Sequence, residues 1–449
     1  MTLISDDLAR WYADYQQVLR SRFDRILGAC GYRGVLIYSG PLPAVFRDDQ
    51  TYPFKVHAWF KAWVPLTDVA DCFLYYEPGA TPLLLLHQPV DYWYKPARLP
   101  EDYWTSQVAL APVVDRAAAR AALPRDLSRI AYIGAAFDEL GAWAPAAVNP
   151  AQLLVPLEFE RAVKLPYELA CLREASRLGA RGHQAAASAF RAAGTSELDI
   201  EIAFLGGCGQ REQELPYNPI VALNESGAVL HYQLLERRAP AVRRSLLIDA
   251  GAEFAGYASD ITRTHAFGQG DFAALIEQFD ELQQSLCASV RAGVDWRDVH
   301  LSAHRLVAEL LHDADITRCD AEEAVETGVS SVFLPHGIGH LLGLQVHDAG
   351  GLLKDASGAE IPRPQGHPHL RLTRVLEAGF VVTMEPGIYF IDQLLEAARA
   401  DARHKKINWQ RVEQLRPHGG IRIEDNLAIT ASGCENLTRD AFRAVGGAP

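Results

Sequence analysis

The sequence reads Phe333-Leu-Pro-His-Gly-Ile-Gly-His-Leu-Leu-Gly-Leu-Gln-Val-His-Asp348 at the point that decides its fold, and three of the chain's fifteen histidines lie in it. Imidazole is a common metal ligand and titrates close to neutral pH. Glycine lets the backbone approach a ligand closely, because it has no Cβ. This apolar loop is therefore a candidate site, and its meaning depends on the partners that the rest of the chain supplies.

The bulk properties are those of a globular protein. A length of 449 residues is too great for one ordinary core, so two domains are expected. The net charge of −13 excludes a surface for nucleic acid or anionic membranes, and no apolar run is long enough to span a bilayer. The N-terminus does not read as a signal peptide. The seven scattered cysteines lack C-x-x-C spacing, which predicts reduced thiols, a cytoplasmic location and a metal site built from oxygen and nitrogen.

The sequence pattern predicts a smaller α/β domain over residues 1–158. A helix is expected from Asp6 to Leu27. Asp48 and Asp49 precede an aromatic-rich segment, and a turn is the simplest interpretation of the pair. The β-rich runs that predict strands lie at residues 34–40, 72–77, 82–87 and 129–134.

Residues 159–449 are predicted to form a second, α+β domain. One helix should begin near Pro166, and the next should have Thr195 or Ser196 as its N-cap. Strands are expected at residues 220–224, 229–234, 379–390 and 419–430, and within residues 246–267, where a hairpin should turn near residues 251–256. Helices are expected at residues 271–292 and 298–313, with a helical insertion at 392–414.

Four carboxylates occupy positions at strand ends inside apolar runs: Asp249, Asp260, Glu385 and Glu424. Aspartate is depleted in strands and is almost never fully buried unless it is paired. Four buried carboxylates would repel one another, and two divalent cations would neutralise their charge. Oxygen-rich ligands with one imidazole suit Mn²⁺, Co²⁺ or Zn²⁺, and Mn²⁺ matches the hardness of the set best. Two such ions could bridge and deprotonate a water molecule, which would then act as nucleophile.

The chain resembles the pita-bread metallopeptidases, which include methionine aminopeptidase, aminopeptidase P and prolidase. The segments HGIGHLLGLQVHD, EPGIYF and GGIRIED are similar to bacterial Xaa-Pro dipeptidase (prolidase), a relative of organophosphorus acid anhydrolase. The likeness extends to DDQTYPFKVHAWFKAW and LPYNPIVALNESGAVLHY, so it covers nearly the full length. It implies an α/β N-terminal domain and a pita-bread catalytic domain, whose curved antiparallel sheet holds two divalent metal ions.

The resemblance also implies the metal ligands. Asp249 would chelate one metal, while Asp260 and Glu424 would bridge both. His340 and Glu385 would hold the other, so only the second histidine of HGIGH would be a ligand.

Other residues would act on the substrate, as the resemblance has them. Glu385 would also carry the proton of the attacking water, and His231 and His347 would stabilise the tetrahedral intermediate or the proline nitrogen. His336 and Arg422 would recognise the substrate's C-terminal carboxylate. Tyr217 would lie close to the metals, and Asp48 or Asp49 would approach the substrate amine from the other subunit of a homodimer.

The expected activity is hydrolysis of Xaa-Pro dipeptides with release of C-terminal proline. The alternative with the same chemistry is an aminopeptidase P, which acts on longer Xaa-Pro peptides. Hydrolysis of organophosphate triesters is expected as a side activity, because it needs the same nucleophile. A non-catalytic binding module is the alternative from another class, and it would not depend on metal.

Two further histidine pairs suggest weaker interpretations. His300 and His304 stand four residues apart at helical spacing, but Leu301 occupies the place of the glutamate in H-E-x-x-H. A half-buried helix face is therefore expected for this pair. His367 and His369 flank a proline in a proline-rich loop, where solvated side chains are expected.

Overall fold

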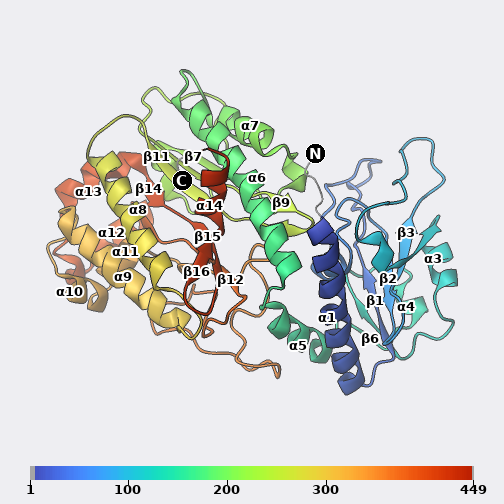
Figure 1. Cartoon of the computed structure of the whole chain (residues 1–449). Coiled ribbons are helices and arrows are strands. Elements are labelled where there is room, and N and C mark those ends of the chain that lie inside the picture. Colours follow the sequence, from blue (N-terminus) through green and yellow to red (C-terminus); the bar gives the residue numbers. More distant parts are fainter. Residues whose placement is uncertain (1–5, 447–449) are drawn as a thin grey trace. The chain divides into compact units, whose positions relative to one another are not determined.

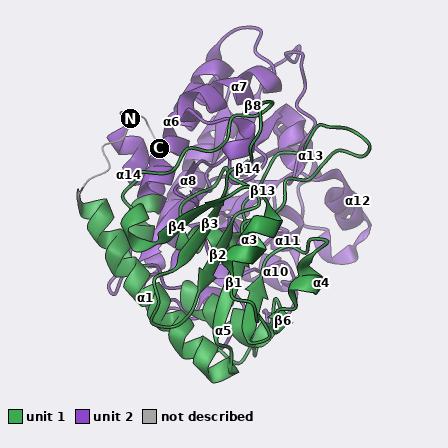
Figure 2. Ribbon diagram, turned by 90° about the vertical axis from the view of Figure 1, so that its right-hand side faces the viewer, with its two compact units in different colours: residues 1–161, 165–171, 355–359 green, residues 162–164, 172–354, 360–449 purple. Residues whose placement is uncertain are grey.

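A computed structural model describes residues 6–446, which fold as two compact units (Figures 1 and 2). Unit 1 comprises residues 1–161, 165–171 and 355–359, and unit 2 comprises residues 162–164, 172–354 and 360–449. None of the helices in the described part of the chain is long and apolar enough to cross a membrane.

Unit 1 is built on a six-stranded sheet in the order β4-β3-β2-β1-β5-β6. β1 pairs antiparallel with β2 and parallel with β5, so the sheet is mixed. The β1 strand is buried along its whole length, as its run of apolar residues predicted. The strands of unit 1 are β1 (Gly34–Tyr38), β2 (Phe73–Tyr76), β3 (Leu83–His87), β4 (Ala109–Val113), β5 (Ile130–Ile133) and β6 (Ala147–Val148).

The helices of unit 1 place aromatic side chains against the core. The predicted first helix is present and ends three residues later than expected. Phe23 of this helix packs on Trp63, with ring centroids 4.9 Å apart. The helices are α1 (Asp6–Cys30), α2 (Ala58–Trp63), α3 (Arg116–Ala122), α4 (Leu140–Trp143), α5 (Ala151–Arg161) and the first residues of α6 (Pro166–Arg191), which continues into unit 2.

Unit 2 contains short antiparallel ladders rather than one unbroken sheet. Their strand orders are β11-β8-β7, β12-β15-β16, β13-β14 and β10-β9. An isolated bridge between Thr262 and Glu424 connects the first ladder to the segment that precedes β15. The strands are β7 (Ile220–Leu223), β8 (Ser245–Asp249), β9 (Glu253–Phe254), β10 (Tyr257–Ala258), β11 (Thr262–Ala266), β12 (Val381–Met384), β13 (Gly387–Tyr389), β14 (Gly420–Arg422), β15 (Asp425–Ile429) and β16 (Cys434–Asn436).

α6 begins at Pro166, as predicted, and the next helix begins after one of the two N-caps expected for it. Ser196 is the N-cap of α7, and its side chain forms a capping box with Asp199. The helical insertion at 392–414 is present as two helices, α12 and α13, rather than one. Besides α6, the helices are α7 (Glu197–Cys208), α8 (Asp271–Ser289), α9 (Trp296–Asp313), α10 (Ala321–Glu326), α11 (Val329–Phe333), α12 (Asp392–Ala400), α13 (Trp409–Leu415) and α14 (Leu437–Ala444).

Two strand predictions were wrong. Residues 229–234 form no strand. Tyr232 is buried and Leu230 packs against the same hydrophobic cluster, but the run pairs with no neighbouring strand among the described residues. Residues 419–430 form two strands instead of one, and the break falls at Ile423 and Glu424. The break has a topological reason, since β14 pairs with β13 whereas β15 pairs with β12.

Candidate active site

Asp249 ends β8, the central strand of its ladder. The register places it opposite Ile220 of β7 and Thr262 of β11. Its carboxylate accepts hydrogen bonds from the Tyr217 hydroxyl (2.7 Å) and from Arg422 Nη2 (2.8 Å). Burial raises the pKa of this carboxyl, and the Arg422 charge offsets only part of that effect.

Asp260 and Glu424 meet across the bridge between β11 and β15. Glu424 pairs with Thr262, whose hydroxyl donates to Glu424 Oε2 at 2.7 Å. Asp260, Glu424 and His340 are all buried, and one ligand atom of each lies within 4.8 Å of the others. Three segments far apart in the sequence thus bring three potential metal ligands together.

The HGIGH loop is fixed against β12. A Cβ on Gly339 would lie 2.1 Å from the carbonyl oxygen of Thr383, so only glycine fits there. The His340 N–H donates to Thr383 Oγ1 (3.1 Å), and the Thr383 N–H donates to the His340 carbonyl (3.0 Å). His340 Nδ1 lies 3.0 Å from the Leu341 carbonyl, which can only accept, so Nδ1 carries the proton. Nε2 is then the ring nitrogen that faces the cluster, where it would bind a metal or, without metal, carry a second proton.

Nε2 of His340 faces two carboxylates. Burial acts to lower the pKa of His340, but hydrogen bonding to Asp260 and the charge of Glu385 outweigh it and raise this pKa. Nε2 lies 3.4 Å from Asp260 Oδ2 and 3.6 Å from Glu385 Oε1. Glu385 follows β12 directly, and its N–H donates to the carbonyl of Ile338 in the HGIGH loop. The five residues predicted as metal ligands therefore lie close together: Asp249 is opposite Thr262, which bonds to Glu424, and Glu385 faces His340.

The electrostatics of the cluster fit a divalent metal. Burial raises the pKa of Glu385 to about 7, and it raises that of Glu424 well above the ordinary range. Burial also acts to raise the pKa of Asp260, but hydrogen bonding and charge from His340 outweigh it and lower this pKa. Carboxylates held so closely are strained by their own repulsion, and oxygen donors with one imidazole match a hard or borderline cation.

A second group of side chains backs the carboxylates. The Tyr389 hydroxyl accepts from Arg422 Nη1 (2.9 Å) and therefore donates to His336 Nε2 (2.8 Å). Arg422 Nε donates to Thr262 Oγ1 at 3.1 Å, so three nitrogens of this buried guanidinium have partners within the protein. Burial lowers the pKa of His336 to about 4, which keeps it neutral near pH 7.

His347 and His231 lie on the solvent side of the cluster. Both residues are exposed, and the His347 ring lies 4.4 Å from the His340 ring at 78°. Burial of its imidazole and the charge of His340 lower the pKa of His347 to about 4, and His231 adds to this effect. The lowered pKa keeps His347 neutral near pH 7.

Asp48 and Asp49 belong to unit 1. Both are exposed, and Asp48 lies in a turn in which its Oδ1 accepts the N–H of Gln50 at 3.2 Å. The turn predicted from their local sequence is therefore present. Their role at the substrate amine of a second subunit stays a prediction.

Sequence reasoning missed three residues that position the cluster: Tyr389, Thr262 and Thr383. Two of them carried a signal, since Thr262 stands two residues after Asp260 and Tyr389 two residues after Gly387, which pairs with Arg422. In a strand, residues two apart face the same side. Thr383 carried no comparable signal, because its contact with His340 comes from a loop.

Of the expectations for the other histidines, only that for His369 is confirmed, since its side chain is exposed. His300 and His304 are each 1% exposed rather than half-buried. His367 is not a solvated loop residue, because its Nδ1 lies 2.9 Å from His300 Nε2. The proline-rich loop contacts α9 at this point, which local sequence could not indicate.

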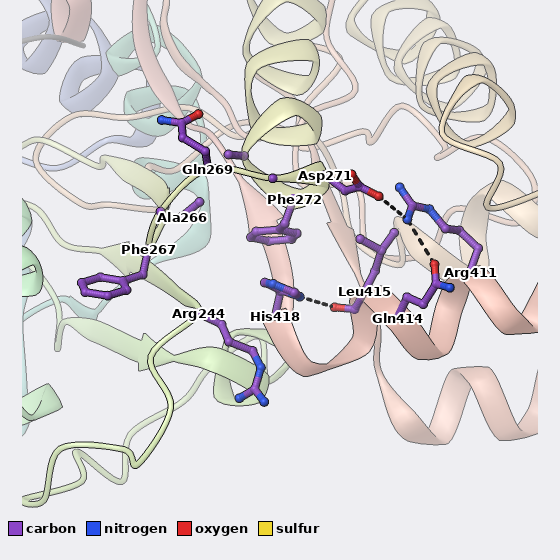
Figure 3. A pocket seen from close by; sticks show the side chains of 13 residues that line it. Arg244, Ala266, Phe267, Gln269, Asp271, Phe272, Arg411, Gln414, Leu415 and His418 are labelled. Atoms are coloured by element: carbon purple, nitrogen blue, oxygen red, sulfur yellow. Dashed lines mark hydrogen bonds and ion pairs between the residues drawn. The ribbon is translucent and has the colours of Figure 1, made fainter.

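A separate cavity of about 410 Å³ opens at the far end of β11 (Figure 3). Thr262 at the start of the strand contacts Glu424, whereas Ala266 at its end lines this cavity. Phe272 and His418 stack in its wall, with ring centroids 4.4 Å apart. None of the predicted site residues lines it, so the cavity is distinct from the carboxylate cluster.

Comparisons with known proteins agree with this geometry. Residues 10–159 match the family model "Xaa-Pro dipeptidase, N-terminal domain", and residues 170–431 match "Metallopeptidase family M24". The Xaa-Pro dipeptidase of Stenotrophomonas maltophilia (strain K279a) is 46% identical over 446 residues, covering 99% of this chain and 100% of that protein. The Xaa-Pro dipeptidase of Xanthomonas campestris pv. campestris (strain B100) is 47% identical over 434 residues, covering 96% and 98%.

Solved structures share the fold at lower sequence identity. Aminopeptidase P from E. coli with the inhibitor Pro-Leu superposes with a TM-score of 0.71 at 24% identity, covering 94% of this chain and 95% of that one. Proline aminopeptidase P II from Yersinia pestis gives 0.70 at 24% identity, covering 95% and 96%. The predicted pairing of an α/β N-terminal domain with a pita-bread catalytic domain is thereby confirmed. The chain belongs to metallopeptidase family M24 and, within it, to the Xaa-Pro dipeptidase family.

Proposed function

We propose that this metallopeptidase hydrolyses Xaa-Pro dipeptides and releases C-terminal proline. The observation that carries the proposal is the buried cluster of Asp260, His340 and Glu424, flanked by Asp249 and Glu385. The names of relatives 46–47% identical over nearly the whole chain support the same substrate class.

In this proposal Asp249, Asp260, His340, Glu385 and Glu424 hold two divalent ions. Mn²⁺ is preferred over Zn²⁺ or Co²⁺, because most of the donors are carboxylate oxygens. When bound, the ions would act as Lewis acids on the scissile carbonyl and lower the pKa of a water molecule. Tyr217 fixes the orientation of Asp249 through its 2.7 Å hydrogen bond.

Proton transfer falls to the chain's own side chains. Glu385 accepts the proton of the attacking water, and a carboxyl whose pKa is about 7 suits that task near neutral pH. The proline nitrogen belongs to a tertiary amide and must be protonated as it leaves. His347 and His231 are the neighbouring imidazoles that stabilise the tetrahedral intermediate or the leaving nitrogen.

Recognition of the substrate carboxylate is assigned to Arg422 and His336. They are linked through the Tyr389 hydroxyl, which orients the guanidinium and the imidazole together. A dipeptide ends at this carboxylate, so such a receptor would set the length of the substrate.

The experiment compares Ala-Pro with Ala-Pro-Ala. Protein stripped by a chelator should be inactive, and added Mn²⁺ should restore cleavage of Ala-Pro. Cleavage of the tripeptide alone would refute the dipeptidase assignment in favour of an aminopeptidase P. Turnover that persists without metal would refute the metallopeptidase mechanism itself.

Three further properties belong to the proposal. A slow hydrolysis of paraoxon, with kcat/KM below that for Gly-Pro, would reveal the organophosphate side activity. The enzyme is expected in the cytoplasm as a homodimer, with Asp48 or Asp49 of one subunit near the substrate amine of the other. Mixed dimers of Asp48→Ala and Asp260→Asn subunits test this arrangement, since one intact site should form if Asp48 acts across the dimer.

A further inference from the structure

A second histidine cluster lies in unit 2 and has no part in the proposed reaction. His300 and His304 stand one turn apart on α9 and therefore share a face of the helix. His367 reaches them from the loop before β12. The three ring centroids lie 4.5–4.8 Å from one another, and one ring nitrogen of each falls within 4.8 Å of the others.

The hydrogen bonds of this cluster leave ring nitrogens unused. His304 Nδ1 lies 3.1 Å from Ser330 Oγ, while its Nε2 has no hydrogen-bond partner among residues 6–446. His300 Nε2 lies 2.9 Å from His367 Nδ1, and His300 Nδ1 is also without a partner in the described chain. Both α9 histidines are 1% exposed, so bulk solvent does not reach the unpartnered nitrogens.

The protonation state suits a ligand set. Burial, together with the neighbouring imidazoles, lowers the pKa of His300 to about 2 and that of His304 to about 3. Neutral imidazoles present lone pairs, whereas imidazolium rings would repel both a cation and one another. Ser330 supplies the outer contact that fixes the orientation of a metal-binding histidine.

We propose that His300, His304 and His367 form a separate metal site that binds one Zn²⁺ ion per chain. Three imidazoles on a tetrahedral zinc would leave a fourth position for water. The edge of such a tetrahedron is about 3.3 Å for Zn–N bonds of about 2.0–2.1 Å. The 2.9 Å between His300 and His367 nitrogens needs only a small outward movement to meet it.

The choice of zinc follows from the donors. Imidazole nitrogens favour Zn²⁺ over Mn²⁺, whereas the carboxylate-rich cluster favours the harder ion. The histidine site would therefore bind Zn²⁺ in preference to Mn²⁺, and the carboxylate cluster would bind Mn²⁺ in preference to Zn²⁺.

The site would fasten a loop that supports the HGIGH segment. Residues His369 and Leu370, next to His367, pack so closely on Gly337 that a Cβ there would lie 2.8 Å from Leu370 Cα. Gly337 in turn follows His336, one of the residues predicted to bind the substrate carboxylate. A zinc ion between α9 and this loop would thus hold the wall behind His336 in place.

The experiment uses full-length protein loaded with Mn²⁺ and then given one equivalent of Zn²⁺. Crystals measured at the zinc and manganese absorption edges should show zinc density between the three imidazoles and manganese at the carboxylates. Zinc should also raise the thermal midpoint of the wild type. His367→Asn changes a half-buried loop residue and should abolish both signals, as should His304→Gln.

His312→Gln is the matched control, because His312 lies on α9 but is exposed and outside the cluster. It should keep the zinc density and the rise in midpoint. Zinc found only at the carboxylates, or zinc retained between the rings in both cluster variants, would overturn the proposal. Neither readout involves peptide hydrolysis, so failure here leaves the proposed dipeptidase activity untouched.

Discussion

In the metal-free protein, the stability of Glu385→Gln relative to the wild type should increase as the pH rises. Burial raises the pKa of Glu385 from 4.5 to about 7 in the folded chain. A carboxyl with a raised folded pKa adds stability below its unfolded pKa, and this stability is lost as the pH rises through the folded value. A pKa raised from 4.5 to about 7 corresponds to about 3 kcal/mol of folding stability at low pH, where the carboxyl is protonated in both the folded and the unfolded chain.

About 2 kcal/mol of this contribution should disappear between about pH 5.5 and about pH 8.5, where one carboxyl passes from mostly protonated to ionised. The absolute curve is not a clean readout, because several buried histidines have lowered pKa values and act in the opposite sense below about pH 6.5. Histidines that do not face Glu385 contribute equally to both proteins, so their contribution cancels in the difference between wild type and Glu385→Gln. The charge of Glu385 raises the pKa of His340, so its removal changes the difference in the same direction. That difference is therefore the quantity to measure.

The assay is urea unfolding of chelator-treated protein at a series of pH values, followed by fluorescence. From about pH 5.5 to about pH 8.5, the free energy of unfolding of Glu385→Gln should rise by about 2 kcal/mol relative to that of the wild type. Glu413→Gln, which removes a half-exposed carboxylate paired with Arg399, is the matched control and should show a constant difference. A constant difference for Glu385→Gln, or one of opposite slope, would refute the electrostatic reasoning. With saturating Mn²⁺ the gain should vanish, because the metal requires the ionised carboxylate.

Three more predictions concern the support of the site. Tyr389→Phe removes a hydroxyl with two buried partners and should lower kcat/KM for Ala-Pro by about 10- to 100-fold. Mass spectrometry should show an unchanged metal content. An unaltered rate would contradict the proposal that this hydroxyl orients Arg422 and His336 together. Gly339→Ala places a Cβ against the Thr383 carbonyl and should lower the free energy of unfolding in urea by about 1–3 kcal/mol. Calorimetry should also show weaker metal binding. Unchanged stability and unchanged metal binding would contradict the close packing of this loop on Thr383. Lys164→Met leaves the fully buried Asp348 without its 2.8 Å ion pair and should destabilise by about 3–5 kcal/mol, and a stability equal to wild type would show that the charge finds another partner.

Local patterns in the sequence predicted the elements better than their junctions. The N-cap at Ser196 and the apolar strands of unit 1 depend on neighbouring residues alone, and both are present. The run at 229–234 looked equally strand-like, but a strand also needs a neighbouring strand to pair with, and such a partner lies far away in the sequence. The break at Glu424 has the same origin, because β14 and β15 pair with different strands.

The sequence predicted which residues could bind metal at the candidate site, but not the hydrogen bonds that connect them to the residues behind them. A carboxylate at the end of an apolar run needs a positive partner, and this reasoning selected Asp249, Asp260, Glu385 and Glu424 before any contact was known. Which side chain would be that partner could not be derived locally. Arg422 donates to Asp249 and Tyr389 joins it to His336, and each contact depends on how separate ladders meet. The half-buried helix face predicted for His300 was wrong for the same reason, because the loop that carries His367 covers it and comes from a distant part of the sequence.

The contact of Arg422 with Asp249 changes the charge balance inferred from sequence. Four carboxylates alone would be neutralised by two divalent ions. In the folded chain Arg422 already balances one of the four, since its Nη2 lies 2.8 Å from Asp249 and it is buried with the cluster. Two divalent ions would then carry one positive charge in excess. A nucleophile that has lost its proton, or the carboxylate of a substrate, supplies one negative charge, so the loaded cluster is neutral only when it holds a reactant. The arginine behind the carboxylates thereby favours binding of the anion that the reaction needs.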